Sequence, residues 1–218
     1  MKKLQLKNSL FPLLRAGSLS LLLALFITQP AFAHHPFGGK LPSNAFEGFL
    51  SGLGHPVIGV DHFAFIITIG LLAALQPKGA LFIPIAFILA TLGGTGIHLL
   101  GVDLPIVEVA ISASLAAFGI LLAMKESPKS LWLSLLAGIA GIFHGYAYGE
   151  AIVGAEMTPL VSYLLGFAAI QLGVALTALQ SGRFVLSRVG EQPALILRFA
   201  GFVLCGAGVA FLSSTLLG

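Results

Sequence analysis

Charged residues are scarce in this chain of 218 residues. Only 9% of the residues are Asp, Glu, Lys or Arg, whereas 57% are hydrophobic, and an ordinary soluble domain carries about 25% charged residues. The mean hydropathy is +1.03, and apolar runs long enough to cross a bilayer recur along the sequence. The composition excludes an ordinary soluble domain and predicts an all-α, polytopic protein embedded in a lipid bilayer.

Other absences narrow the function. The chain has one cysteine, Cys205, which excludes an intramolecular disulfide and a thiolate metal cluster, and in an apolar helix we expect it to pack. The formal net charge of +3 comes without a basic stripe suited to nucleic acid, so no nucleic-acid partner is expected. There is no Walker motif, so we do not expect this chain to hydrolyse ATP.

The N-terminal segment has the pattern of a secretory signal peptide. The basic MKKLQLKNSL is followed by the apolar GSLSLLLALFI and then by QPAFA, with Ala31 and Ala33 before the expected cut. We expect residues 1–33 to be removed, which leaves His34 and His35 at the start of the mature chain. The alternative is a retained first helix, but the apolar run is shorter than the about 20 residues that a span needs.

Six further apolar segments, separated by turn sequences, predict six transmembrane helices. Their approximate ranges are 56–75, 80–100, 105–124, 131–151, 158–180 and 195–217. The expected organisation is a signal peptide at 1–33, an outer tail with an interfacial helix at 34–55, and a six-helix transmembrane domain at 56–218.

The distribution of Lys and Arg predicts the orientation. If the mature N-terminus lies outside, the outer side carries only Lys40, whereas the cytoplasmic loops carry Lys78, Lys125, Lys129, Arg183 and Arg188. Cytoplasmic loops of membrane proteins carry an excess of such cations. We therefore expect a multi-pass protein of the inner or plasma membrane, with both mature termini outside.

Histidines and carboxylates gather at one end of the predicted helices. They open the first and third spans and close the second and fourth: His55, Asp61 and His62 in GHPVIGVDHF, His98, Glu108, and His144 with Tyr148 and Glu150 in FHGYAYGE. At about 1.5 Å per residue, all lie within about 10 Å of the predicted outer surface. Ionisable groups inside a bilayer are costly and mark ion or substrate paths.

This set of side chains favours a divalent transition metal. Neutral imidazole with carboxylate suits Ni, Co, Zn or Cu(II). On a straight helix, His55 and His62 stand about 10 Å apart and cannot share an ion. Because the residue before a proline avoids helical geometry, we expect His55, which precedes Pro56, to leave the helix and fold back towards Asp61 or His62.

The expected path begins at His34 and His35 and continues to a partly dehydrated site formed by Asp61, His62, His144 and Glu108. Each residue also has a structural interpretation. Asp61 and His62 are explained as a buried pair, Glu108 as a cap on its own helix, His98 as an interfacial histidine, and Tyr148 as part of an aromatic belt. These interpretations explain the clustering poorly.

At these motifs the chain resembles the HupE/UreJ family. HPVIGVDH matches the His-x5-Asp-His pattern of the family, and LPIVEVAIS in the third span and FHGYAYGE in the fourth fit the same context. The resemblance covers essentially the whole mature chain. It implies secondary transport of Ni²⁺ or Co²⁺ that feeds hydrogenase or urease assembly. The ligands that it implies are His55, Asp61, His62, Glu108, His144 and Glu150.

The chain departs from the family pattern at Tyr148, where a second histidine is usual, so Zn²⁺ and Cu²⁺ stay open beside Ni²⁺ and Co²⁺. We expect a permease rather than an enzyme, with the metal as cargo and no prosthetic group. One alternative is an intramembrane metal-dependent hydrolase in which Ser112 or Ser114 assists. Another is a metal-binding assembly factor that does not transport.

Overall fold

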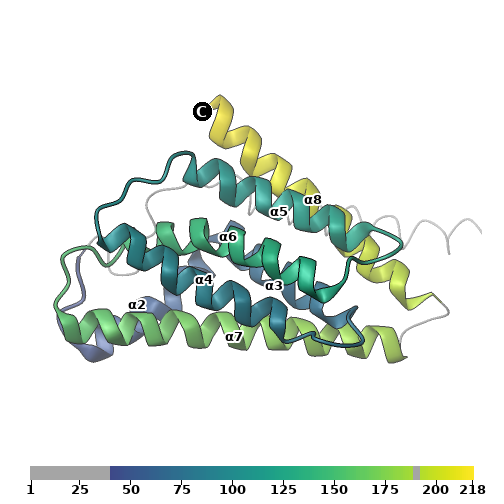
Figure 1. Ribbon diagram of the computed structural model, residues 1–218, viewed down its shortest axis with the longest axis horizontal. Coiled ribbons are helices and arrows are strands. Elements are labelled where there is room, and N and C mark those ends of the chain that lie inside the picture. Colours follow the sequence, from purple (N-terminus) through teal and green to yellow (C-terminus); the bar gives the residue numbers. More distant parts are fainter. Residues whose placement is uncertain (1–39, 189–191) are drawn as a thin grey trace, which may run out of the picture. The chain divides into compact units, whose positions relative to one another are not determined.

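The computed structural model describes residues 40–188 and 192–218 of the chain, and within these ranges every regular element is a helix. The helices, labelled in Figure 1, are α2 (Ala45–Ile58), α3 (Val60–Ala74), α4 (Phe82–Leu99), α5 (Val107–Ala123), α6 (Ser130–Glu150), α7 (Met157–Arg188) and α8 (Pro193–Leu217). The all-α class is confirmed. The expected signal peptide at 1–33, and His34 and His35, lie outside the described residues.

The multi-pass membrane class is also confirmed. Within the described residues, α4, α6, α7 and α8 are each long and apolar enough to cross a membrane, and α2 and α3 pass the same test together. The remaining helix, α5, is apolar and has 17 residues. All six predicted segments therefore contain a helix, while the count of six spans stays a prediction.

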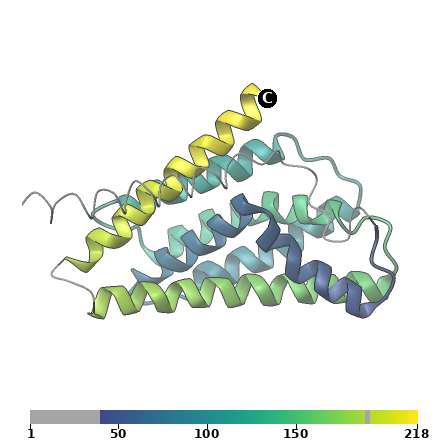
Figure 2. The ribbon, with the colours of Figure 1, turned by 180° about the vertical axis from the view of Figure 1, so that it is seen from behind.

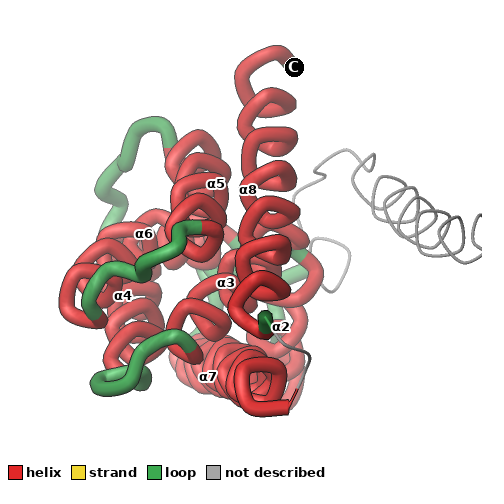
Figure 3. The backbone as a smooth tube through the Cα atoms, turned by 90° about the vertical axis from the view of Figure 1, so that its right-hand side faces the viewer, coloured by secondary structure: helices red, strands yellow, loops and turns green. Residues whose placement is uncertain are grey.

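Three helix pairs pack closely because glycines face a neighbouring backbone. A Cβ on Gly145 of α6 would overlap the Thr91 carbonyl of α4, one on Gly52 of α2 would overlap a carbonyl of α7, and one on Gly208 of α8 would overlap α5. Small residues let helices approach in this way where lipid removes the usual hydrophobic drive between them. Seen along the helices (Figure 3), α3 lies among these pairs, and it contacts every other described helix.

Helix α7 is longer than the sequence predicted. The predicted fifth span at 158–180 lies inside this helix, which continues through the polar stretch to Arg188. Gly182 packs on Ala74 at the end of α3, and tertiary packing of this kind stabilises a helix more than local propensity does. The 32 residues of α7 give a rod about 48 Å long. Figure 2 shows α2 crossing its first part.

The first predicted span is broken. Helices α2 and α3 meet at an angle of 80°, and Gly59 between them has an extended backbone. His55 was expected to leave the helix before Pro56, and this was wrong, because both residues lie inside α2. The Tyr163 hydroxyl of α7, 3.1 Å from His55 Nδ1, helps to hold His55 there. The bend at Gly59, rather than an exit of His55 from its helix, brings His55 close to His62.

Candidate metal site

A buried pair of histidines lies where α3 meets α6. His62 Nδ1 and His144 Nδ1 are 2.8 Å apart, and the two residues are 5% and 0% exposed. Two ring nitrogens at this distance share one hydrogen, so one ring donates and the other accepts. The sequence predicted this approach from the position of both residues at one end of their helices.

Neighbouring hydrogen bonds fix which ring donates. The Ser114 hydroxyl of α5 donates to the Ile111 carbonyl at 2.7 Å, so its oxygen accepts from His144 Nε2, which is 3.1 Å away. With its hydrogen on Nε2, neutral His144 accepts at Nδ1. His62 therefore donates from Nδ1 and carries its lone pair on Nε2. The hydrogen bond at one ring nitrogen sets which nitrogen binds a metal.

His55 is held in the same tautomer by a different element. The Tyr163 hydroxyl donates to the backbone carbonyl of Tyr148 at 2.8 Å, so it accepts from His55 Nδ1 at 3.1 Å. Neutral His55 thus also has its lone pair on Nε2. The ring centroids of His55 and His62 are 6.3 Å apart, which is the result of the bend at Gly59.

Tyr148 lies between these two histidines. Its ring centroid is 4.6 Å from that of His62 and 5.2 Å from that of His55. The residue is 0% exposed, and its hydroxyl has no hydrogen-bond partner in the described structure. An unsatisfied buried hydroxyl costs about 1–3 kcal/mol. The geometry thus places a tyrosine whose hydroxyl has no protein partner in contact with two imidazole rings.

The carboxylates form an acidic rim, which we define as Asp61, Glu108 and Glu150. Glu108 and Glu150 are exposed and Asp61 is half-buried, and the charges of Asp61 and Glu150 act on the Glu108 carboxyl. Asp61 Oδ1 also accepts from the His62 backbone N–H at 2.8 Å. The structure therefore groups Glu108 with the other carboxylates, whereas His144 is fully buried.

The remaining predicted ligands lie apart. His98 packs on α6, with its ring centroid 4.3 Å from that of Tyr146, and its buried Nδ1 has no hydrogen-bond partner among the described residues. Over the same ranges, no group of three or more His, Cys, Asp or Glu side chains stands ready to hold a metal ion. The closest assembly is instead made of imidazoles and tyrosines.

Sequence reasoning missed Tyr163, which orients His55, and it placed Tyr148 in the fourth-span motif without predicting its contact with His55 and His62. A tyrosine in an apolar span carries no signal that separates these roles. It also missed Gln171 of α7, which is 0% exposed and donates to the Phe167 carbonyl at 3.1 Å. A side-chain amide within an apolar span is a signal that was present in the sequence, because buried amides need partners.

These features define a multi-pass helical membrane protein with a buried histidine and tyrosine cluster below an acidic rim. The chain belongs to the HupE/UreJ family, because residues 21–211 match the family described as HupE / UreJ protein. It is 31% identical over 192 residues to Protein HupE of Rhizobium leguminosarum bv. viciae, covering 85% of this chain and 93% of that protein. The resemblance seen in the sequence is thereby confirmed. No solved structure matches the chain.

Proposed function

We propose that this protein is a permease that takes up a divalent transition metal, Ni²⁺ or Co²⁺, as its cargo. The observation that carries the proposal is the cluster of His55, His62, His144 and Tyr148 buried among membrane helices. Membership of HupE/UreJ, a transporter family associated with nickel and cobalt uptake, supports transport rather than catalysis. Imidazole is a ligand that suits these metals.

The acidic rim collects the cation in this proposal. Asp61, Glu108 and Glu150 give one end of the bundle a local negative potential, which raises the concentration of divalent cations there. We propose that this end faces outside, as the distribution of Lys and Arg predicts, and that His34 and His35 meet the metal first. The metal would serve hydrogenase or urease assembly within the cell.

Binding then passes to His55 and His62. Both rings hold a hydrogen bond at Nδ1, and neutral imidazole is the form that binds a metal. His144 holds the His62 ring in place through the hydrogen bond between their Nδ1 atoms. The Tyr148 hydroxyl donates to a water that the cation still carries. A site with two protein nitrogens and retained water binds less tightly than a closed structural site, and transport needs cargo that can leave.

The proposal is tested by uptake of radioactive nickel and cobalt into proteoliposomes. His62→Ala should abolish uptake, and Asp61→Asn should reduce it strongly because it keeps the shape and removes the charge. His98→Ala is the matched control, since His98 lies outside the cluster, and its uptake should stay close to wild type.

Other outcomes would overturn the proposal. Wild-type uptake by His62→Ala would mean that the histidine pair is structural. A wild-type protein that binds metal tightly but moves none across the bilayer would favour the assembly factor, and metal-dependent cleavage of a substrate would favour the hydrolase.

A further inference from the structure

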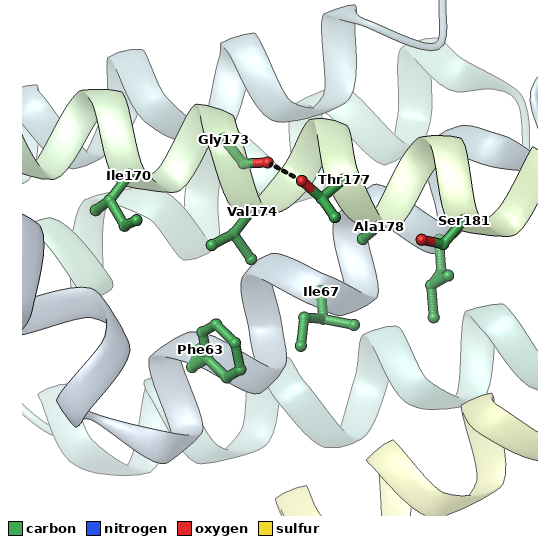
Figure 4. Close-up of a pocket in the computed structure, with 9 residues that line it drawn as sticks. Phe63, Ile67, Ile170, Gly173, Val174, Thr177, Ala178 and Ser181 are labelled. Carbon is green, nitrogen blue, oxygen red and sulfur yellow. Dashed lines mark hydrogen bonds between the residues drawn. The ribbon is translucent and has the colours of Figure 1, made fainter.

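An apolar groove lies between α3 and α7 and contains none of the histidines or tyrosines of the cluster. Its volume is about 490 Å³. Phe63, Ile67 and Leu71 form the α3 wall, and Ile170, Val174 and Ser181 mark the α7 wall from end to end. Figure 4 shows Phe63, Ile67 and Val174 facing a common space, with the Thr177 hydroxyl turned to the Gly173 carbonyl. The groove is therefore mainly a hydrocarbon surface, and the Thr177 hydroxyl within it is already hydrogen-bonded.

The dimensions of the groove favour a single hydrocarbon chain. The α7 wall rises about 16 Å from Ile170 to Ser181 at about 1.5 Å per residue. Spread over that length, 490 Å³ corresponds to a cross-section of about 30 Å², or a width of about 6 Å. A helix with its side chains is about 10–12 Å across, so a whole helix does not enter, whereas an acyl chain does.

The charge at one end of the groove identifies the headgroup. Arg188 follows Ile170 by 18 residues, which is five full helical turns, so it stands on the groove face of α7. Side chains on a helix tilt towards its N-terminus, which directs Arg188 back towards Ser181. Lys78 is in the loop that follows α3, whose last residue, Ala74, packs on Gly182 of α7.

The residues around the Ser181 end of the groove carry an excess of positive charge. Among the described residues at this end, there are six cations and one carboxylate. The cations are Lys78, Lys125, Lys129, Arg183, Arg188 and Arg198, and the carboxylate is Glu126. Arg198 is already engaged, because its Nε donates to the Ala123 carbonyl at 2.9 Å. Basic groups at the ends of membrane helices attract anionic lipid headgroups.

We propose that the groove between α3 and α7 binds one anionic phospholipid, with an acyl chain along Phe63, Ile67 and Val174 and the phosphate at Arg188. Arginine holds a phosphate through two parallel hydrogen bonds. The acyl chain would lie alongside the contacts that α3 and α7 make at Gly70 and Gly182. This site is independent of the proposed metal transport.

Native mass spectrometry of the full-length protein, incubated in detergent with phosphatidylglycerol or phosphatidylcholine, tests the proposal. Wild type should retain one phosphatidylglycerol in preference to phosphatidylcholine. Arg188→Gln should retain phosphatidylglycerol about tenfold more weakly, because a charge-assisted hydrogen bond is lost. Arg183→Gln is the matched control, since Arg183 stands about 140° around α7 from Arg188.

A second pair of variants tests the acyl-chain part of the groove. A Cβ on Gly173, or on Gly206 of α8, meets nothing within 4 Å, so Gly173→Leu fills the groove and Gly206→Leu is its control. Only Gly173→Leu should abolish retention of both lipids. Equal retention by all four variants would overturn the proposal. A wild-type dimer that Gly173→Leu converts to a monomer would also overturn it, because another copy would then fill the groove.

Discussion

At the scale of single residues, the tyrosines decide how the histidines of the site are presented. Tyr163 fixes the His55 tautomer, and Tyr148 packs against both His55 and His62. The sequence predicted that the histidines lie together, because their positions in the predicted spans and the order of those spans bring them to one end of the bundle. It gave no access to the tautomers, which depend on hydrogen bonds between helices far apart in the chain.

Tyr148→Phe separates packing from hydrogen bonding. It keeps the ring contacts and removes a buried hydroxyl without a partner, so the thermal midpoint of unfolding should stay equal or rise. If the hydroxyl meets the water carried by the cation, the KM for metal uptake should rise several-fold while Vmax changes less. Uptake kinetics and a melting curve on the same preparation check both parts. An unchanged KM would remove Tyr148 from the site.

Uptake should also depend on pH. Imidazole must be neutral to bind a metal, and its ordinary pKa is about 6.5. Protons and metal therefore compete, and the initial rate should fall as the pH on both sides of the liposome is lowered from about 8 to 5.5. Rates measured with equal pH inside and outside check this without an imposed gradient. A flat profile would contradict binding by neutral histidines.

At the scale of helices, glycines set the distances on which the site depends. Gly145 lies one residue after His144 and faces Thr91 of α4, whose backbone leaves no room for a Cβ. The same contact is reinforced by the Thr95 hydroxyl, which donates to the Gly145 carbonyl at 2.7 Å. The position of His144 is therefore coupled to the packing of α4 on α6.

Gly145→Ala should push α4 away from α6 and destabilise the protein by about 1–3 kcal/mol, the usual cost of overpacking. The thermal midpoint of unfolding in detergent should fall. Gly138→Ala on the same helix is the control, because a Cβ there meets nothing within 4 Å and alanine is the better helix former. Equal midpoints for the two variants would show that the α4–α6 contact is looser than described.

Most helices were predictable because apolar length is a strong signal, and all six predicted segments contain a helix. The break at Gly59 was not, since a proline three residues earlier predicted the helix boundary in the wrong place. The extension of α7 to Arg188 was also missed, because the packing of Gly182 on Ala74 overrides the polar composition of that stretch.

At the scale of the whole molecule, the two ends of the bundle differ in charge. The acidic rim lies at one end, and the loop that contains Lys125 lies at the opposite end of α5. The basic end is tied together by the Gln76 amide, which donates to the Ser127 hydroxyl at 2.9 Å and to the Pro128 carbonyl at 3.1 Å. The positive-inside rule then predicts which end faces the cytoplasm.

Cysteine labelling in intact cells checks that orientation. In a Cys205→Ser background, an impermeant maleimide should label Asp103→Cys and should not label Lys125→Cys until the cells are opened. Both positions are exposed and lie in loops at opposite ends of α5. The reverse pattern would turn the acidic rim towards the cytoplasm and contradict uptake through it.

The 80° angle between α2 and α3 places His55 on one helix and His62 on the next, with Gly59 between them. His55 lies four residues from Gly59, or about 6 Å along the helix. A change of about 20° in this angle moves His55 by about 2 Å relative to His62, which is the length of a bond between zinc and a histidine nitrogen. If a cation binds both rings, as proposed above, a small change of the backbone at Gly59 would alter how tightly the two histidines hold it.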